Sequence, residues 1–322
     1  MPRTTLPATI DAVATAITLA VEDEAAVHGF ALAEKSDATR RAYRSDFRVF
    51  SAWCAGRGFE PLPAAPTVVA AFLADQAKSG VKPSTLGRRV AAIAYAHDLA
   101  GMASPASAKV VRVVLVGIRR EKGAKPTQKA PATAERIAAM IEAIPDTRRG
   151  QRDKALLAVG FAGAFRRSEV VALEVADITY EPDGVRVQIR HSKTDQEGQG
   201  QEIAIPRGSK LRPVRALQAW LKAARIKDGP VFRSIDKHGH IGGALTPQSV
   251  ALIVKTHAEA AGLDAREFSG HSLRAGFLTS AAEAGADVLR MMEVSRHKRV
   301  ETLQAYVRRA SLFKGHAGKN FL

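Results

Sequence analysis

The spacing of apolar residues predicts helices along most of the chain. In the segment 36–54, apolar side chains recur at the three- and four-residue intervals of one helical face; they are Tyr43, Phe47, Phe50 and Cys54. Arginines follow the same period on another face, at Arg41, Arg44 and Arg48. A helix with this pattern buries one side in a core and leaves a cationic side exposed.

Two further helices are predicted in the same region. The first is expected to have Thr67 as its N-cap and to stop at Gly80, and the second to be capped by Ser84. The inner stripe of the second consists of Leu86, Val90 and Ile93. Arg88 and Arg89 are predicted to lie outside. Exposed arginines are often merely solvated, but two cationic helix faces in one region favour contacts with phosphates.

The rest of the chain mixes helices with two predicted strands. Thr133 is expected to cap one helix, and Thr246 with Pro247 to start another. Strict alternation of apolar and polar residues predicts the strands, whose inward positions are Val185, Val187, Ile189, Ile203 and Ile205. The polar segment between them has the composition of a hairpin tip. The predicted fold is therefore mainly α with a small antiparallel β-sheet.

Composition and charge divide the chain into parts. Residues 1–31 are net negative and are expected to form a partly ordered arm, and residues 121–132 are rich in lysine and proline, as a flexible linker is. Between them, residues 32–120 form a predicted helical and basic domain. Residues 133–310 form a predicted α+β domain, followed by a tail at 311–322.

Net charge indicates a polyanionic partner. The chain carries 48 Lys and Arg against 32 Asp and Glu, which gives a formal charge of +16 and a pI of about 10.3. Residues 32–130 and 131–322 are both net positive, as expected for two domains that form a clamp around DNA.

Other partners and compartments fit the sequence less well. The longest apolar run, residues 68–74, is too short to span a membrane, and no basic segment with a following apolar stretch suggests secretion. Cys54 is the single cysteine, so it forms no internal disulfide and offers no zinc cluster. We expect a cytoplasmic, nucleoid-associated protein with neither a metal nor another cofactor.

Residues suited to phosphate chemistry recur in a definite order. Arg166 precedes Glu169 by three positions, and Lys193 lies in the predicted hairpin tip. His271 and Arg274 are separated by one helical turn, which directs both from one helix face, and His297 precedes Tyr306 by nine residues. Arginine forks bind phosphate oxygens through paired charge-assisted hydrogen bonds.

This order resembles that of the tyrosine recombinases, also called phage integrases, over roughly residues 32–322. Members of this family share an arginine followed by a glutamate, a hairpin lysine, a His-x-x-Arg pair, a His or Trp, and a tyrosine about ten residues later. In size and layout the chain is similar to the Cre and Xer recombinases. The resemblance implies that residues 32–120 are a core-binding, SAM-like domain that binds DNA and that residues 133–310 are the catalytic domain. Each motif alone is weak, but their joint order on a basic two-part chain is specific.

The resemblance implies a site-specific DNA recombinase or integrase that needs neither metal nor ATP. Tyr306 would form a covalent 3′-phosphotyrosyl intermediate, with Arg166 and Arg274 holding the phosphate and Glu169 bracing the first arginine. His271 would exchange the tyrosine proton, Lys193 would protonate the leaving oxygen, and His297 would bind a non-bridging oxygen. A homotetramer would pair two double-stranded recombination sites, each tail docking on a neighbouring protomer.

Two positions depart from the family pattern. Arg167 stands where an apolar residue is usual, so the clamp arginine is open to a one-residue shift, although the spacing to Glu169 favours Arg166. Arg296 stands before His297, where glycine is common, so the local turn is open to question. Lys193 is assigned by its place in the predicted hairpin and not by a fixed spacing, because hairpin lengths vary in the family.

Three alternatives use the same residues differently. A type IB topoisomerase shares the chemistry without pairing duplexes. A DNA-binding regulator could keep the fold without catalysis, although an unused site has no reason to retain the whole set. A zinc protein would use His238 and His240, which have no further ligands at suitable spacing.

Overall fold

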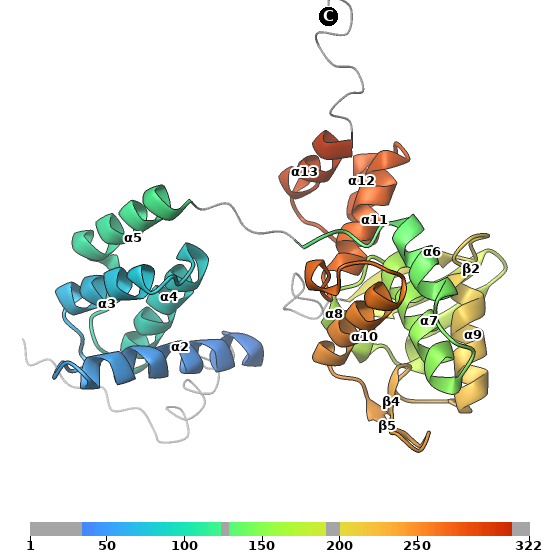
Figure 1. Cartoon of the computed structure of the whole chain (residues 1–322), viewed down its shortest axis with the longest axis horizontal. Helices are drawn as coiled ribbons and strands as arrows, with labels where there is room; N and C mark the ends of the chain where they lie inside the picture. Colours follow the sequence, from blue (N-terminus) through green and yellow to red (C-terminus); the bar gives the residue numbers. More distant parts are fainter. Residues whose placement is uncertain (1–33, 124–128, 191–199, 311–322) are drawn as a thin grey trace, which may run out of the picture. The chain divides into compact units, whose positions relative to one another are not determined.

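The computed structural model describes residues 34–123, 129–190 and 200–310. The described residues form two compact units, residues 34–123 and residues 129–310 with their internal gap (Figure 1). In the described ranges no helix is both long and apolar enough to cross a membrane. Lys193, the 1–31 arm and the 311–322 tail lie outside the described residues.

The first unit is a bundle of α-helices. Its helices are α2 (Asp37–Ala55), α3 (Pro66–Lys78), α4 (Pro83–Leu99) and α5 (Lys109–Lys122), with a 3-10 turn at Pro105–Ser107. The predicted stripe of α2 faces inward, with Phe50 and Cys54 fully buried. Phe50 packs edge-on against Phe72 of α3 at 5.1 Å between ring centroids. Aromatic contacts of this kind join the helices into one core.

Two helix starts in this unit differ from the sequence prediction. The helix α3 begins at Pro66 rather than after a Thr67 cap, and α4 begins at Pro83 rather than after Ser84. In both cases proline occupies the first helical position, where its fixed φ is suitable and its missing N–H is not needed. Gly80, in a left-handed conformation, follows the end of α3 closely, as predicted.

The second unit combines α-helices with two small antiparallel sheets. Its helices are α6 (Ala134–Glu142), α7 (Arg148–Ala162), α8 (Arg167–Ala172), α9 (Pro213–Ala224), α10 (Pro247–Ala260), α11 (Ser272–Glu283), α12 (Val288–Ser295) and α13 (Val300–Ala310). Its strands are β1 (Ile178–Glu181), β2 (Gly184–Ile189), β3 (Gln201–Pro206), β4 (Arg233–Ile235) and β5 (Ile241–Ala244). Two 3-10 turns, at Val175–Asp177 and Ala265–Glu267, complete it.

The predicted hairpin is present, and it belongs to a sheet that has one strand more than expected. Strands β2 and β3 pair antiparallel, with Ile189 opposite Gln201 at the described end of the hairpin. Val185, Val187, Ile203 and Ile205 are buried, as the alternation predicted. Strand β1 adds to the free edge of β2, and β4 with β5 makes a separate hairpin (Figure 1).

Close packing fixes helix α11 in this unit. A Cβ at Gly276 would lie 1.8 Å from the carbonyl oxygen of Ala132, so only glycine allows this approach. The backbone N–H of Ala132 donates to the carbonyl of Ser272 at 2.9 Å. The start of α11, which carries Arg274, is thereby held against the segment that leads into α6.

Candidate active site

Arg166 is held in place by the glutamate three residues after it. Arg166 is the N-cap of α8, and its backbone N–H donates to Glu169 Oε2 at 2.8 Å. Its Nη1 also donates to Glu169 Oε1 at 2.6 Å. Arg167, by contrast, is exposed. The glutamate therefore fixes both the backbone and the side chain of Arg166 and leaves Arg167 outside this pair.

Arg274 extends from the first turn of α11 into the same region. Only 4% of it is exposed, and its Nη1 donates to the carbonyl of Ala164, in the loop before α8, at 2.8 Å. Burial, followed by the charges of Arg166 and Arg296, lowers the pKa of Arg274 to about 9. Three cations around one carboxylate leave this region with excess positive charge, which suits the binding of an anion.

His297 lies directly beside Arg274. Arg274 Nη2 is 3.3 Å from Nδ1 and 3.4 Å from Nε2 of the imidazole. Burial, and then the charge of Arg274, lowers the pKa of His297 to about 4, so the ring is neutral near pH 7. The Ser295 hydroxyl donates to the carbonyl of Met291 at 2.6 Å, so its oxygen is free to accept from Nδ1–H at 2.8 Å. This favours the tautomer whose Nε2 keeps a lone pair.

Tyr306 comes from α13 and is half-buried. Its ring packs against a small apolar cluster that contains Leu278, Met291 and Leu303. Burial raises the pKa of the Tyr306 phenol above its ordinary value, and the positive charge of Arg274 acts in the opposite direction. The phenol is therefore protonated near pH 7 and lies within the electrostatic influence of Arg274.

Known proteins are similar to this chain in sequence and in fold. Residues 132–311 match the phage integrase family. The chain is 41% identical to an integrase/recombinase XerD homologue of Selenomonas ruminantium, over 88% of this chain and 85% of that protein. It is 31% identical to a tyrosine recombinase of Synechococcus elongatus, over 84% and 85% of the two chains. The chain belongs to the tyrosine recombinase family.

Solved structures with the same fold are more distant in sequence. The Tn1549 transposon integrase in complex with transposon right end DNA gives a TM-score of 0.61 at 14% identity, covering 86% of this chain and 93% of that one. The XerH site-specific recombinase bound to its palindromic difH substrate gives 0.58 at 18% identity, covering 77% and 70%. The protein is thus a tyrosine recombinase in sequence and in fold, and neither the topoisomerase nor the inactive-regulator alternative is favoured.

The other predicted site residues of this tyrosine recombinase are placed less fully. His271 is the N-cap of α11, one turn before Arg274, and its side chain is exposed, whereas Arg274 is buried. The backbone N–H of His271 donates to the Ser269 hydroxyl at 3.2 Å. Lys193 belongs to the segment that connects β2 to β3, outside the described residues.

One site residue was not predicted from the sequence. Arg296 buries its guanidinium next to Arg166 and donates to Glu169 Oε2 at 2.7 Å. Its only signal in the sequence was its position before His297, where glycine is common in the family. Nothing in the sequence indicated that its side chain turns inward.

The predicted DNA-binding arginines of the first unit fall into two groups. Arg41, Arg44 and Arg48 are exposed on α2, as predicted. The prediction for α4 is wrong for Arg89, whose side chain is only 13% exposed and lies over the ring of Phe72. Its neighbour Arg88 is half-exposed and donates to the buried Asp46 at 2.6 Å. The inward turn of Arg89 follows from polar partners on α2 and α3, which a stripe on α4 alone does not reveal.

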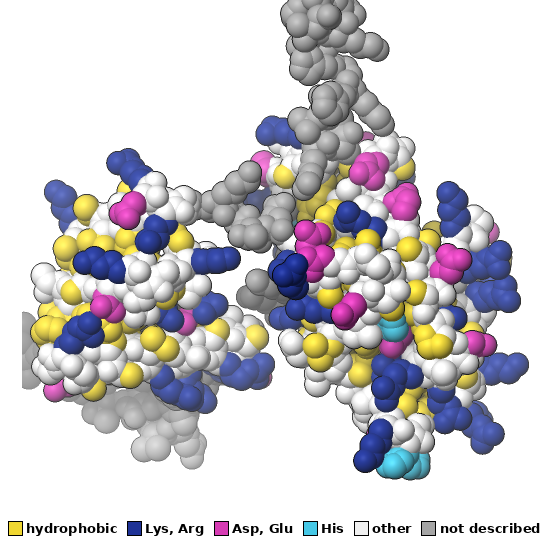
Figure 2. Space-filling model, in the orientation of Figure 1, with side chains coloured by type: hydrophobic (Ala, Val, Ile, Leu, Met, Phe, Trp, Pro, Cys, Tyr) yellow, Lys and Arg dark blue, Asp and Glu magenta, His cyan; other side chains and the backbone are white. Residues whose placement is uncertain are grey.

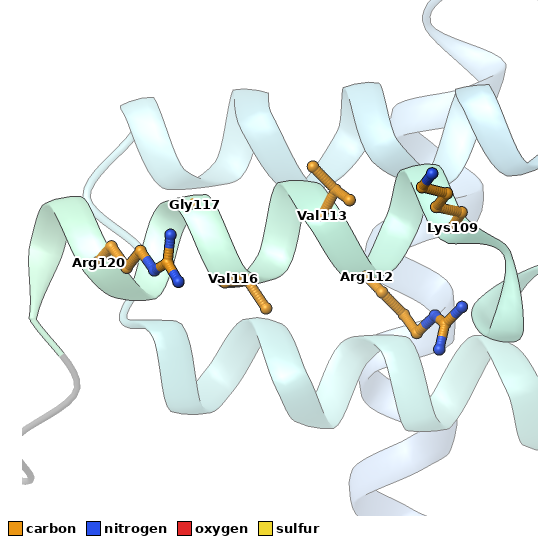
Figure 3. A pocket seen from close by; sticks show the side chains of 6 residues that line it. All are labelled: Lys109, Arg112, Val113, Val116, Gly117 and Arg120. Carbon is orange, nitrogen blue, oxygen red and sulfur yellow. The ribbon is translucent and has the colours of Figure 1, made fainter.

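Further cations line a shallow groove on α5 (Figure 3). It is lined by Lys109, Arg112, Val113, Val116, Gly117 and Arg120. Val113 and Val116 are exposed between the cations. Figure 2 shows Lys and Arg side chains on the visible faces of both units. These surfaces suit the backbone of a nucleic acid.

The zinc alternative gains no support from the geometry. His238 and His240 lie on the β4–β5 hairpin, with ring centroids 6.1 Å apart, and His240 Nδ1 pairs with Asp236 Oδ2 at 3.0 Å. Among the residues that the structure describes, no three His, Cys, Asp or Glu side chains are arranged to hold a metal ion.

Proposed function

We propose that this recombinase cleaves and rejoins DNA at a specific site through a covalent bond between Tyr306 and a 3′-phosphate. The observation that carries the proposal is the convergence of Arg166, Arg274 and a neutral His297, with Tyr306 within the electrostatic influence of Arg274. Their charge is uncompensated by nearby carboxylates other than Glu169 in the described residues, and a phosphodiester would supply the missing negative charge.

The phosphate would be bound by three side chains. Arg166 and Arg274 would each donate to a non-bridging oxygen, where negative charge accumulates as the tyrosine attacks. The negative charge of the bound phosphate would raise the proton affinity of His297. The protonated ring would then donate to the other non-bridging oxygen. Glu169 would keep Arg166 extended toward the phosphate, because it holds both the backbone and the guanidinium of that residue.

The chemical step exchanges one phosphodiester for another. The Tyr306 oxygen would attack phosphorus, and the bond from phosphorus to the 5′-oxygen would break. His271 would take the proton of the phenol, and Lys193 would supply a proton to the departing 5′-oxygen. In the reverse sense a 5′-hydroxyl from a partner duplex would attack the phosphotyrosine, so the energy of the bond is conserved and no ATP is consumed.

We also propose how the protein assembles on DNA, since strand exchange requires two duplexes to be held together. The two positively charged units would close around one double-stranded site as a clamp, with Arg41, Arg44, Arg48 and Arg88 on phosphates. Four protomers would pair two such sites, with residues 311–322 of each docking on a neighbour. The protein would act in the cytoplasm at the nucleoid.

Recovery of covalently bound DNA tests this proposal. Cells that express the chain are lysed under denaturing conditions, and the DNA that stays attached to the protein is sequenced. We expect one short motif, cut at a fixed position, and strand exchange between two copies of that motif in vitro. Adducts spread over unrelated sequences, with relaxation of supercoils but no exchange, would instead indicate topoisomerase activity.

A further inference from the structure

Arg296 adopts a backbone conformation that arginine rarely has. It follows the last residue of α12 with a φ of 58°, in the left-handed region where glycine is the favoured residue. Arg225, which follows α9, has a similar φ of 53° but is exposed. Only 5% of Arg296 is exposed. A buried cation on an unfavourable backbone persists where its contacts compensate for both costs.

Those contacts connect the end of α12 to the loop that precedes α8. Arg296 Nη1 donates to the carbonyl of Gly163 at 3.0 Å, and Nη2 donates to that of Ala164 at 3.1 Å. Its guanidinium also lies 5.3 Å from the centre of the Phe165 ring. One side chain therefore holds three consecutive residues of the loop that leads to Arg166.

The same guanidinium contacts groups that also bind Arg166 and Arg274, the two arginines proposed to hold the phosphate. Glu169 accepts from Arg166 through Oε1 and from Arg296 through Oε2 at 2.7 Å. The carbonyl of Ala164 accepts from Arg296 Nη2 and from Arg274 Nη1. Arg296 also directly precedes His297 in the chain. Its removal would therefore free one oxygen of Glu169 and loosen the loop between the two arginines.

The charge of Arg296 also balances that of Glu169. Burial would raise the pKa of Glu169, but the charges of Arg296 and Arg166 and the bonds from Arg166 hold it below its ordinary value. With Arg296 present, the carboxylate is shared between two cations. Arg166 then retains positive charge for the phosphate instead of being neutralised within a single ion pair.

We propose that Arg296 is a positioning residue of the recombinase, which holds Glu169 and the Gly163–Phe165 loop so that Arg166 and Arg274 face one phosphate. This inference rests on the proposed roles of those two arginines. Arg296 itself contacts no DNA in this scheme. It acts through the carboxylate and the loop carbonyls, and it fills the position at which glycine is common in the family.

Replacement of Arg296 by glycine isolates the side chain from the backbone. Arg296→Gly keeps a residue that tolerates the left-handed conformation, so its backbone is not strained. Arg225→Gly is the matched control, because it makes the same change at a similar φ on an exposed residue. Arg296→Lys keeps the positive charge but has no planar fork to reach Glu169 and two carbonyls together.

Single-turnover cleavage at saturating enzyme is the main measurement. For Arg296→Gly we expect a fall of about 10- to 100-fold, by analogy with the loss of residues that orient metal ligands. DNA affinity should change far less. Arg296→Lys should recover part of the rate, and Arg225→Gly should match the wild type. A wild-type rate for Arg296→Gly, or equal losses of rate and affinity, would overturn the inference.

Histidine NMR measures the electrostatic effect of Arg296 on the site separately from the cleavage rate. His297 is faced by Arg274 from α11, by Arg166 from the start of α8 and by Ser295 from α12. The charge of Arg296 contributes to its low pKa, so Arg296→Gly should raise the titration midpoint of His297 above that of the wild type and of Arg225→Gly. An unchanged midpoint in a folded Arg296→Gly protein would contradict the inference.

Failure of the proposed function gives a different result. If the wild type forms no covalent adduct with its site, or if the adduct does not depend on Tyr306, the roles assigned to Arg166 and Arg274 are wrong. If that adduct forms and depends on Tyr306, while Arg296→Gly cleaves normally, only the role of Arg296 is wrong.

Discussion

Arg274 places its Nη2 atom 3.3 Å from Nδ1 of His297, so a buried cation and a neutral imidazole lie side by side at the centre of the site. Burial lowers the pKa of both groups, and the charge of Arg274 lowers that of His297 further. This arrangement is costly in the free protein and favourable once an anion binds, which is the behaviour expected of a preorganised phosphate site.

The low pKa of His297 predicts a loss of stability in mild acid. The folded chain binds the His297 proton only near pH 4, whereas the unfolded chain binds it near the ordinary value of 6.5. Between these values the unfolded state holds the extra proton, so the contribution of neutral His297 is present above pH 6.5 and is lost as the pH falls toward 4. Urea denaturation at pH 7 and pH 5 measures this.

The matched variant is His297→Gln, which cannot titrate and can still bond to Ser295. The wild type should lose more free energy of unfolding between pH 7 and pH 5 than this variant does. Equal losses in the two proteins would show that His297 is not held neutral.

Replacement of Arg166 or Arg274 should lower the cleavage rate more than the affinity for DNA. Arg166→Ala or Arg274→Ala removes charge stabilisation made mainly in the transition state, which costs about 10²- to 10³-fold for one lost donor in comparable sites. Single-turnover cleavage at saturating enzyme and equilibrium binding of the same site measure the two effects. Loss of affinity without loss of the saturated rate would mean that these arginines lie outside the reacting centre.

The exposed arginines of α2 should show the opposite signature. Replacement of Arg41, Arg44 or Arg48 by alanine should weaken binding and reduce the slope of log K against log salt by about 1 per lost phosphate contact. The saturated cleavage rate should stay near that of the wild type. Arg89→Ala is the contrast, because its buried side chain should affect the stability of the bundle rather than the salt slope. An unchanged slope in the α2 variants would remove that face from the DNA interface.

Much of the fold could be predicted because each element carries its own pattern. The stripe through Phe50 and Cys54 and the alternation through Val185 and Val187 report burial directly, since period and exposed face are local properties. Strands β4 and β5 are only three and four residues long, and β1 has no buried alternation, so no local pattern revealed them.

The order of the site residues along the chain could be predicted from the sequence, but the contacts between their side chains could not. The pairing of Arg166 with Glu169 follows from their spacing at a helix start, where the carboxylate of the third helical residue can accept from the backbone N–H of the N-cap. The inward turns of Arg89 and Arg296 depend on partners distant in sequence: Gln76 and Phe72 in one case, Glu169 in the other. A cation's exposure is decided by such partners and not by the helix that carries it.

Cleavage should not depend on a divalent metal. The proposed mechanism stabilises charge with guanidinium groups, transfers the tyrosine proton to His271 and supplies the leaving-group proton from Lys193, so no bound ion has a role in it. Adduct formation by metal-free protein should proceed at the same rate in EDTA and in magnesium. A loss of cleavage in EDTA that added magnesium restores, with DNA binding unchanged, would contradict this mechanism.

The covalent bond to Tyr306 is the most direct test of the whole account. The recovered DNA site, nicked so that the cleaved end diffuses away, is incubated with wild-type protein and with Tyr306→Phe, and the trapped adduct is mapped by peptide mass spectrometry. We expect an SDS-resistant adduct on the wild-type peptide that contains Tyr306, and none on the variant, which should bind the site with unchanged affinity because it lacks only a hydroxyl. An adduct that persists in Tyr306→Phe, or that maps to Tyr43, Tyr95 or Tyr180, would contradict the assignment of the nucleophile.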